Sequence, residues 1–100
     1  MEWQFNYKAI AASQTASALG APGGLGDWIE SIIIIPATTS PGAVSIADGG
    51  GSAITLFAGG ATSVQGLAPF QVLVEARSRV GGWTVTTGAN VSVVATGLWS

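Results

Sequence analysis

The segment DWIESIIIIP, residues 27–36, decides the fold of this 100-residue chain. In an extended strand, successive side chains point to opposite faces. The two predicted faces are Trp28, Ile32 and Ile34 on one side, and Ile29, Ile33 and Ile35 on the other. A strand that is apolar on both faces is covered on both sides, either inside the fold or at an interface with a partner. We therefore predict a central strand over residues 27–35.

Period-two alternation of apolar and polar residues extends outward from this segment and predicts strands along most of the chain. Turn sequences separate the strands. Ser40-Pro41-Gly42 fits a type II turn with Gly42 at positive φ, and Asp48 with the glycines after it fits a hairpin loop. The predicted strands are residues 2–9, 14–19, 27–35, 43–47, 53–57, 68–77, 82–87 and 91–99.

Seven to eight short strands with regular turns predict an all-β fold. We expect a single domain over residues 1–100, an antiparallel β-sandwich with a jelly-roll-like topology. An immunoglobulin-like topology is the alternative.

The composition excludes several classes of function. The chain has no histidine and no cysteine, so it cannot assemble a Ser-His-Asp or Cys-His nucleophile or a His/Cys zinc site. Three basic residues against five acidic ones disfavour nucleic-acid binding. We expect a protein that is not an enzyme, with no cofactor, no metal and no nucleic-acid partner.

Charged residues make up only 8% of the chain, against about 25% in an ordinary soluble domain. Such a surface offers little electrostatic resistance to association, which favours a subunit whose surface is covered by neighbours. The longest purely aliphatic run is four residues, and no basic leader segment precedes it. We therefore expect synthesis in a cytoplasm and no membrane association.

Three segments resemble small all-β proteins of tailed bacteriophages, the capsid decoration (cement) proteins. These segments are IIIIPATTSPG at 32–42, FAGGATS at 57–63 and GWTVTTGANVS at 82–92. The resemblance implies a β-sandwich or jelly roll that adheres to the major capsid protein on the exterior of the virion, made in the cytoplasm of a bacterial host. It also implies a homotrimer without cofactors. We expect its sandwich edges to pack around a threefold axis.

Five aromatic residues are the candidate interface residues: Trp3, Phe5, Tyr7, Trp28 and Trp99. Tryptophan and tyrosine dominate the energetics of many protein interfaces. Residues 1–10 are a candidate anchoring strand, because three of the eight aromatic residues fall between Trp3 and Tyr7. The alternative is that this strand closes the chain's own sandwich.

Two other functions remain open at this point. One is a different virion subunit, from the tail, neck or fibre base. The other is a carbohydrate-binding β-sandwich that uses an exposed tryptophan as a platform.

Overall fold

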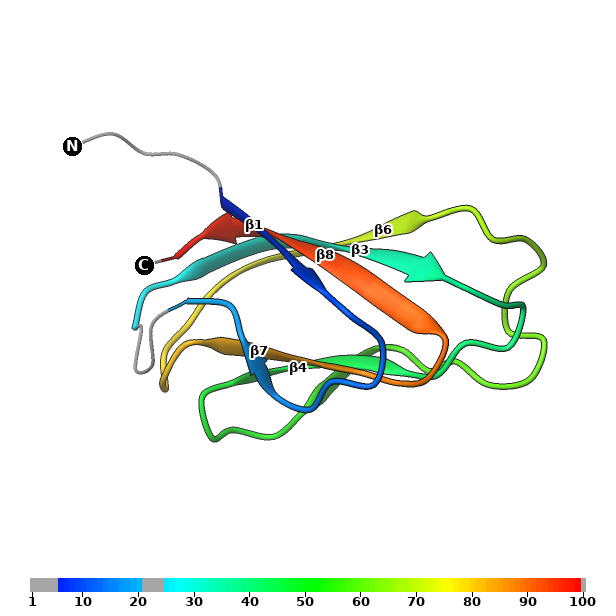
Figure 1. Cartoon of the computed structure of the whole chain (residues 1–100). Coiled ribbons are helices and arrows are strands. Elements are labelled where there is room, and N and C mark those ends of the chain that lie inside the picture. The colour runs from blue at the N-terminus through cyan, green and yellow to red at the C-terminus, as the bar shows by residue number, and fades with distance from the viewer. Residues whose placement is uncertain (1–5, 21–24, 100) are drawn as a thin grey trace.

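The strand β3 (Trp28–Pro36) lies in the interior of a four-stranded antiparallel sheet. The computed structural model describes residues 6–20 and 25–99. β3 pairs on one side with β8 (Val91–Leu98) and on the other with β6 (Phe70–Arg77). β1 (Asn6–Ile10) completes the first sheet beside β8, which gives the order β1-β8-β3-β6 (Figure 1).

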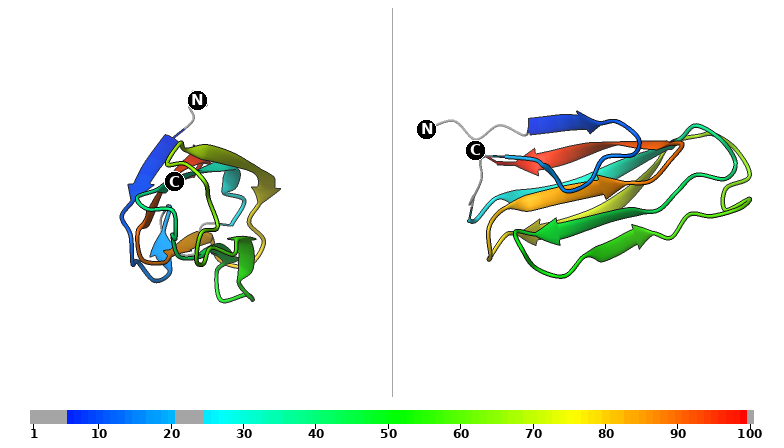
Figure 2. Two further views of the ribbon diagram at one scale, coloured as in Figure 1. Left: turned by 90° about the vertical axis from the view of Figure 1, so that its right-hand side faces the viewer. Right: turned by 60° about the horizontal axis from the view of Figure 1, so that its bottom comes forward.

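The second sheet packs against the first and has the order β2-β7-β4-β5 (Figure 2). Its strands are β2 (Ser17–Ala18), β7 (Trp83–Thr87), β4 (Val44–Asp48) and β5 (Ile54–Phe57). The chain changes sheet at every connection except the hairpin between β4 and β5. Eight antiparallel strands in these two orders form a jelly roll, so the predicted all-β sandwich is confirmed.

All eight observed strands overlap the predicted segments, and β2 differs most from its prediction. It contains only Ser17 and Ala18 instead of residues 14–19. Two amides before it are bonded to threonine side chains of β7: Gln14 N donates to Thr87 Oγ1 and Ala16 N to Thr86 Oγ1, both at 3.0 Å. These bonds replace ladder pairing and shorten the strand.

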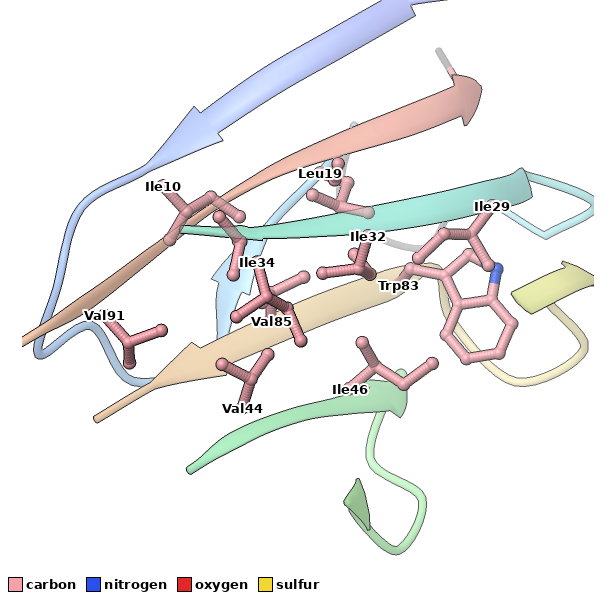
Figure 3. Packing of buried hydrophobic residues seen from close by; sticks show 12 residues of the cluster. Ile10, Leu19, Ile29, Ile32, Ile34, Val44, Ile46, Trp83, Val85 and Val91 are labelled. Atoms are coloured by element: carbon pink, nitrogen blue, oxygen red, sulfur yellow. The ribbon is translucent and has the colours of Figure 1, made fainter. Parts of the chain in front are cut away.

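The core lies between the two sheets and is aliphatic (Figure 3). Side chains from both sheets meet there, and Trp83 fills one end of the space. The indole Nε1 of Trp83 donates to the Asp27 carbonyl at 3.1 Å, so its polar group is satisfied. The buried hydrophobic residues are Ile10, Leu19, Ile29, Ile32, Ile34, Val44, Ile46, Trp83, Val85, Val91, Val93 and Ala95.

The predicted faces of β3 are partly wrong, because the strand contains a β-bulge. Ile29 pairs with Gly97 and Ser31 with Thr96, so Glu30 is an extra residue relative to β8. The extra residue reverses the alternation before it. Ile29 therefore joins Ile32 and Ile34 in the core, while Trp28 lies on the outer face with Ile33 and Ile35.

The turn predicted at residues 40–42 is also wrong in its detail. Gly42 is not among the glycines with positive φ. It is needed for close packing instead, because a Cβ atom there would lie 2.8 Å from the Gly88 Cα and 2.8 Å from the Ala89 nitrogen. The predicted loop after Asp48 is confirmed, and Gly49 in it has a φ of 58°.

Candidate functional site

The two outer faces of the sandwich differ in chemistry. The outer face of the second sheet is covered mainly by hydroxyl side chains, and we call it the hydroxyl face: Ser45, Thr55, Thr84 and Thr86, with Ala18 and Ala47. The outer face of the first sheet is mainly hydrocarbon, and we call it the aliphatic face: Tyr7, Ala9, Ile33, Ile35, Leu73 and Val94.

Cross-strand pairing brings the residues of the aliphatic face together. Val94 lies between Ala9 and Ile33 in one row across the sheet, and Tyr7 and Leu73 occupy opposite edges of the next row. Tyr7 is 76% exposed and Leu73 is 62% exposed. Thr96 and Ser31 lie between Tyr7 and Leu73, so the face carries apolar side chains around a polar middle. The chain itself leaves these apolar side chains open, which is typical of an interaction surface.

The polar groups in the middle of this face bond to one another. Ser31 Oγ lies 2.8 Å from Thr96 Oγ1 and accepts a hydrogen bond of 3.0 Å from Gln71 Nε2. Ser31 is fully buried on this face, although it lies on the side of the sheet that points away from the core. A partner that covers the face would therefore meet a polar group whose hydrogen bonds are already made, which lowers the cost of desolvation.

Trp28 lies at the border of the aliphatic face and is held on two sides. Its Nε1 donates to Glu30 Oε1 at 3.0 Å, and the Arg77 guanidinium carbon lies 5.5 Å from the centre of its ring. Arg77 Nη1 also donates to the Gly26 carbonyl at 3.1 Å. The indole is a fixed part of the surface, because both neighbours restrict its rotation.

The structure brings two of the five predicted interface residues together. Tyr7 and Trp28 lie on the same outer face, through their pairing with Thr96 and Leu98 of β8. Trp99 packs against the hydrophobic core instead, close to Gly97, so its side chain is partly buried on its own sandwich. Trp3 and Phe5 lie outside the described residues.

The charged residues gather toward one end of the sandwich, which we call the charged end. It contains the start of β3, the end of β4, the end of β6 and the loop from β6 to β7. Six of the seven described charged residues lie there: Asp27, Glu30, Asp48, Glu75, Arg77 and Arg79. Lys8, the seventh, lies in the middle of β1.

The opposite end, which we call the loop end, carries no charged residue. It consists of residues 11–16, 37–43, 58–69 and 88–90, all of them described. Backbone groups hold three of these loops together: Gly42 N donates to the Ala89 carbonyl at 2.8 Å, and Gly60 N donates to the Pro41 carbonyl at 2.8 Å. Figure 1 shows these loops gathered at the end of the sandwich away from the tip of the β8 arrow.

Asp48 is an ionisable group whose surroundings shift its pKa. Its carboxylate accepts backbone hydrogen bonds from Arg79, Val80 and Gly81, the shortest of them 2.7 Å from Arg79 N. Desolvation acts to raise the pKa of Asp48, but these amides outweigh it and hold the pKa below its usual value. Asp48 therefore fastens the loop between β6 and β7 to the hairpin of β4 and β5.

Sequence reasoning missed the hydrogen bonds by which Asp48 holds the loop between β6 and β7. It also missed the gathering of charged residues at the charged end. A signal for the charged end was present, since residues 49–74 contain no charged residue.

Among the described residues there is no group of three or more acidic, histidine or cysteine side chains that could hold a metal ion. The described residues also form no helix that could span a membrane.

Comparison with protein-family models, with curated proteins and with solved structures found no match for this chain.

Proposed function

We propose that this chain is a structural virion protein that binds the exterior of a bacteriophage head and reinforces it, and that the aliphatic face docks on the major capsid protein. The observation that carries the proposal is the contrast between the two outer faces: one sheet presents mainly hydroxyl groups to water, and the other presents mainly apolar side chains around a small polar cluster. The resemblance of three segments to capsid decoration proteins supplies the partner.

The dimensions of the face indicate how strongly one copy can bind. Strands of up to nine residues at about 3.3 Å each, in four strands about 4.8 Å apart, give roughly 500 Å². A standard stable interface buries about 800 Å² on each partner. One copy would therefore bind weakly through this face alone. Stable attachment then needs several copies that bind together, which agrees with the expected homotrimer.

The carbohydrate-binding alternative finds less support in the described tryptophans. Trp83 is buried, and Trp99 packs against the core. Trp28 is half-buried, with Arg77 over its ring and its Nε1 bonded to Glu30. A sugar platform needs a free ring face with polar groups that converge beside it. A jelly roll by itself does not separate the two functions, because lectins and capsid proteins share it.

The test uses heads that lack this protein and measures binding of added variants. Tyr7→Lys combined with Leu73→Lys places two charges on the aliphatic face, at exposed positions where the fold tolerates them. The matched control is Thr55→Lys, an exposed position on the hydroxyl face. We expect the double variant to bind at least about tenfold more weakly and the control to bind like the natural chain. Equal binding by all three proteins would show that the aliphatic face is not the contact.

Imaging separates the head from other parts of the virion. An antibody fragment that binds this chain should label the head surface of purified particles. Label confined to the tail, neck or fibre base would overturn the proposal in favour of another virion subunit. A signal on a glycan array, together with a change in tryptophan fluorescence on sugar addition, would instead support the carbohydrate-binding function.

A further inference from the structure

We propose that the loop end is the contact surface between copies of this chain. The occupant of this surface is the loop end of another copy. The inference goes beyond binding to the head, because it does not require a head for the contact to form.

Charge distribution is the first argument. Six charged residues lie toward the charged end and none lies at the loop end. Two copies that approach through their charged ends bring like net charge together and desolvate side chains such as Arg79 and Glu75. If the charged end of one copy meets the loop end of another, the same charged residues are buried against loops that hold no opposite charge. Of these three end-on arrangements, only contact between two loop ends desolvates no charged group.

The rigidity of the loop end is the second argument. Hypothetical Cβ atoms show how closely three loops meet: one on Gly59 would lie 2.6 Å from the Gly42 carbonyl oxygen, and one on Gly88 would lie 2.8 Å from the Gly42 Cα. Side-chain bonds add to this, since Thr62 N donates to Ser40 Oγ at 3.0 Å. Loops that are already ordered lose little conformational entropy on binding, which favours association.

The composition of the loop end is the third argument. Most of its exposed residues are small or hydroxylated, Gln14, Gln65 and Asn90 carry uncharged amides, and Leu67 is a large apolar side chain that is 53% exposed. An apolar side chain on a rigid, uncharged surface is suited to a contact between identical surfaces. Contact between like ends also closes the assembly around a symmetry axis, because the charged ends then point outward and cannot add further copies.

The edge strand β6 is less suited to this contact. β6 is the long edge strand of the first sheet, and it carries Glu75 and Arg77. Glu75 has a φ of 52°, in the left-handed region, at an irregular pairing with β3. Charged residues and bulges on an edge strand disfavour the addition of another strand. A trimer of this chain would therefore meet through its loop ends rather than through β6.

The absence of cysteine from the chain allows a direct test. Ser63→Cys places one thiol on the loop end, and Ser52→Cys places one on the exposed loop between β4 and β5 at the charged end. Any disulfide that forms must join two copies at the same position. Each purified variant is oxidised gently at millimolar concentration, and disulfide-linked dimer is measured over time on non-reducing gels.

We expect the Ser63→Cys protein to form dimer at least about tenfold faster than the Ser52→Cys protein, because contact raises the local thiol concentration. Adding Leu67→Lys to Ser63→Cys should remove this advantage, while adding the matched exposed change Val80→Lys should keep it. Equal rates for the two cysteine variants, or faster dimer formation by Ser52→Cys, would overturn the inference. Head binding is measured separately with Tyr7→Lys and Leu73→Lys, so failure of the head proposal leaves the oxidation result unchanged.

Discussion

Gly59 is the residue on which the packing of the loop end depends most. It has a φ of 69°, and a Cβ atom there would lie 2.6 Å from two carbonyl oxygens, those of Pro41 and Gly42. Gly59→Ala should lower the free energy of unfolding by about 2 kcal/mol or more, since the left-handed conformation alone costs about 1–2 kcal/mol. Urea unfolding monitored by tryptophan fluorescence measures the change.

Gly66 in the same loop provides the control. A Cβ atom there would meet nothing within 4 Å, and its φ is not positive. Gly66→Ala should leave stability unchanged or raise it by up to about 1 kcal/mol, because alanine restricts the unfolded chain. Similar losses for Gly59→Ala and Gly66→Ala would contradict the packing described here.

Asp48 makes stability depend on pH in the acid range. Because its pKa is lower in the folded chain, its contribution is fully present above the ordinary carboxyl pKa of about 3.9 and is lost as the pH falls through the lower folded value. Asp48→Asn removes the charge that the three amides favour and should cost about 1 kcal/mol at neutral pH. The difference in melting temperature between the two proteins should shrink as the pH falls below about 4. A difference in melting temperature that does not change with pH would show that the charge of Asp48 has no part in holding the loop between β6 and β7.

The bulge at Glu30 is the decisive feature at the scale of the element. Deletion of Glu30 would remove the extra residue, so that Ile29 stays opposite Gly97 in the core, Ser31 stays opposite Thr96, and Trp28 stays on the outer face. We therefore expect the deletion to cost less than the about 2–5 kcal/mol that an emptied core isoleucine site usually costs. Glu30→Ala keeps the bulge and removes only the bond to Trp28, so it should cost less than about 1 kcal/mol. Circular dichroism and urea unfolding compare the two, and a loss of about 2–5 kcal/mol on deletion would contradict the placement of Glu30 as the extra residue.

Strand positions could be predicted from the sequence because alternation is a local property. Val91, Val93 and Ala95 alternate with polar or half-buried neighbours, and β8 follows them. The bulge could not be predicted, because one extra residue shows only in the pairing of β3 with β8. Tyr7 and Trp28 could be named as candidates, but not placed on one face. That placement depends on strand order, as does the gathering of charge at one end.

At the scale of the whole molecule, two roles of the N-terminal region can be tested separately. One is the contribution of β1 to the sandwich, and the other is the expected anchoring by Trp3 and Phe5. Pairing of β1 with β8 begins at Asn6, and Ile10 belongs to the core. Removing residues 1–5 keeps all the described pairs of β1, whereas removing residues 1–10 should cost about 2–5 kcal/mol for the loss of Ile10 alone. The first protein then tests the anchoring expectation for Trp3 and Phe5. Weaker head binding with an intact fold supports an anchor, and unchanged binding shows that the aliphatic face is sufficient.

The two unlike faces also make the molecule a rigid surfactant. Because Ile33, Ile35 and Val94 lie on one side and Thr84 and Thr86 on the other, only one broad surface is readily wetted by water. At an air–water boundary the free protein should spread as a film one molecule thick, with the hydrocarbon side toward the air. Surface tension should fall at low protein concentration, and specimens frozen in thin ice should show one dominant view. Once the hydrocarbon side is covered, the broad face that remains presents mainly hydroxyl groups to water, and the molecule loses its tendency to adsorb.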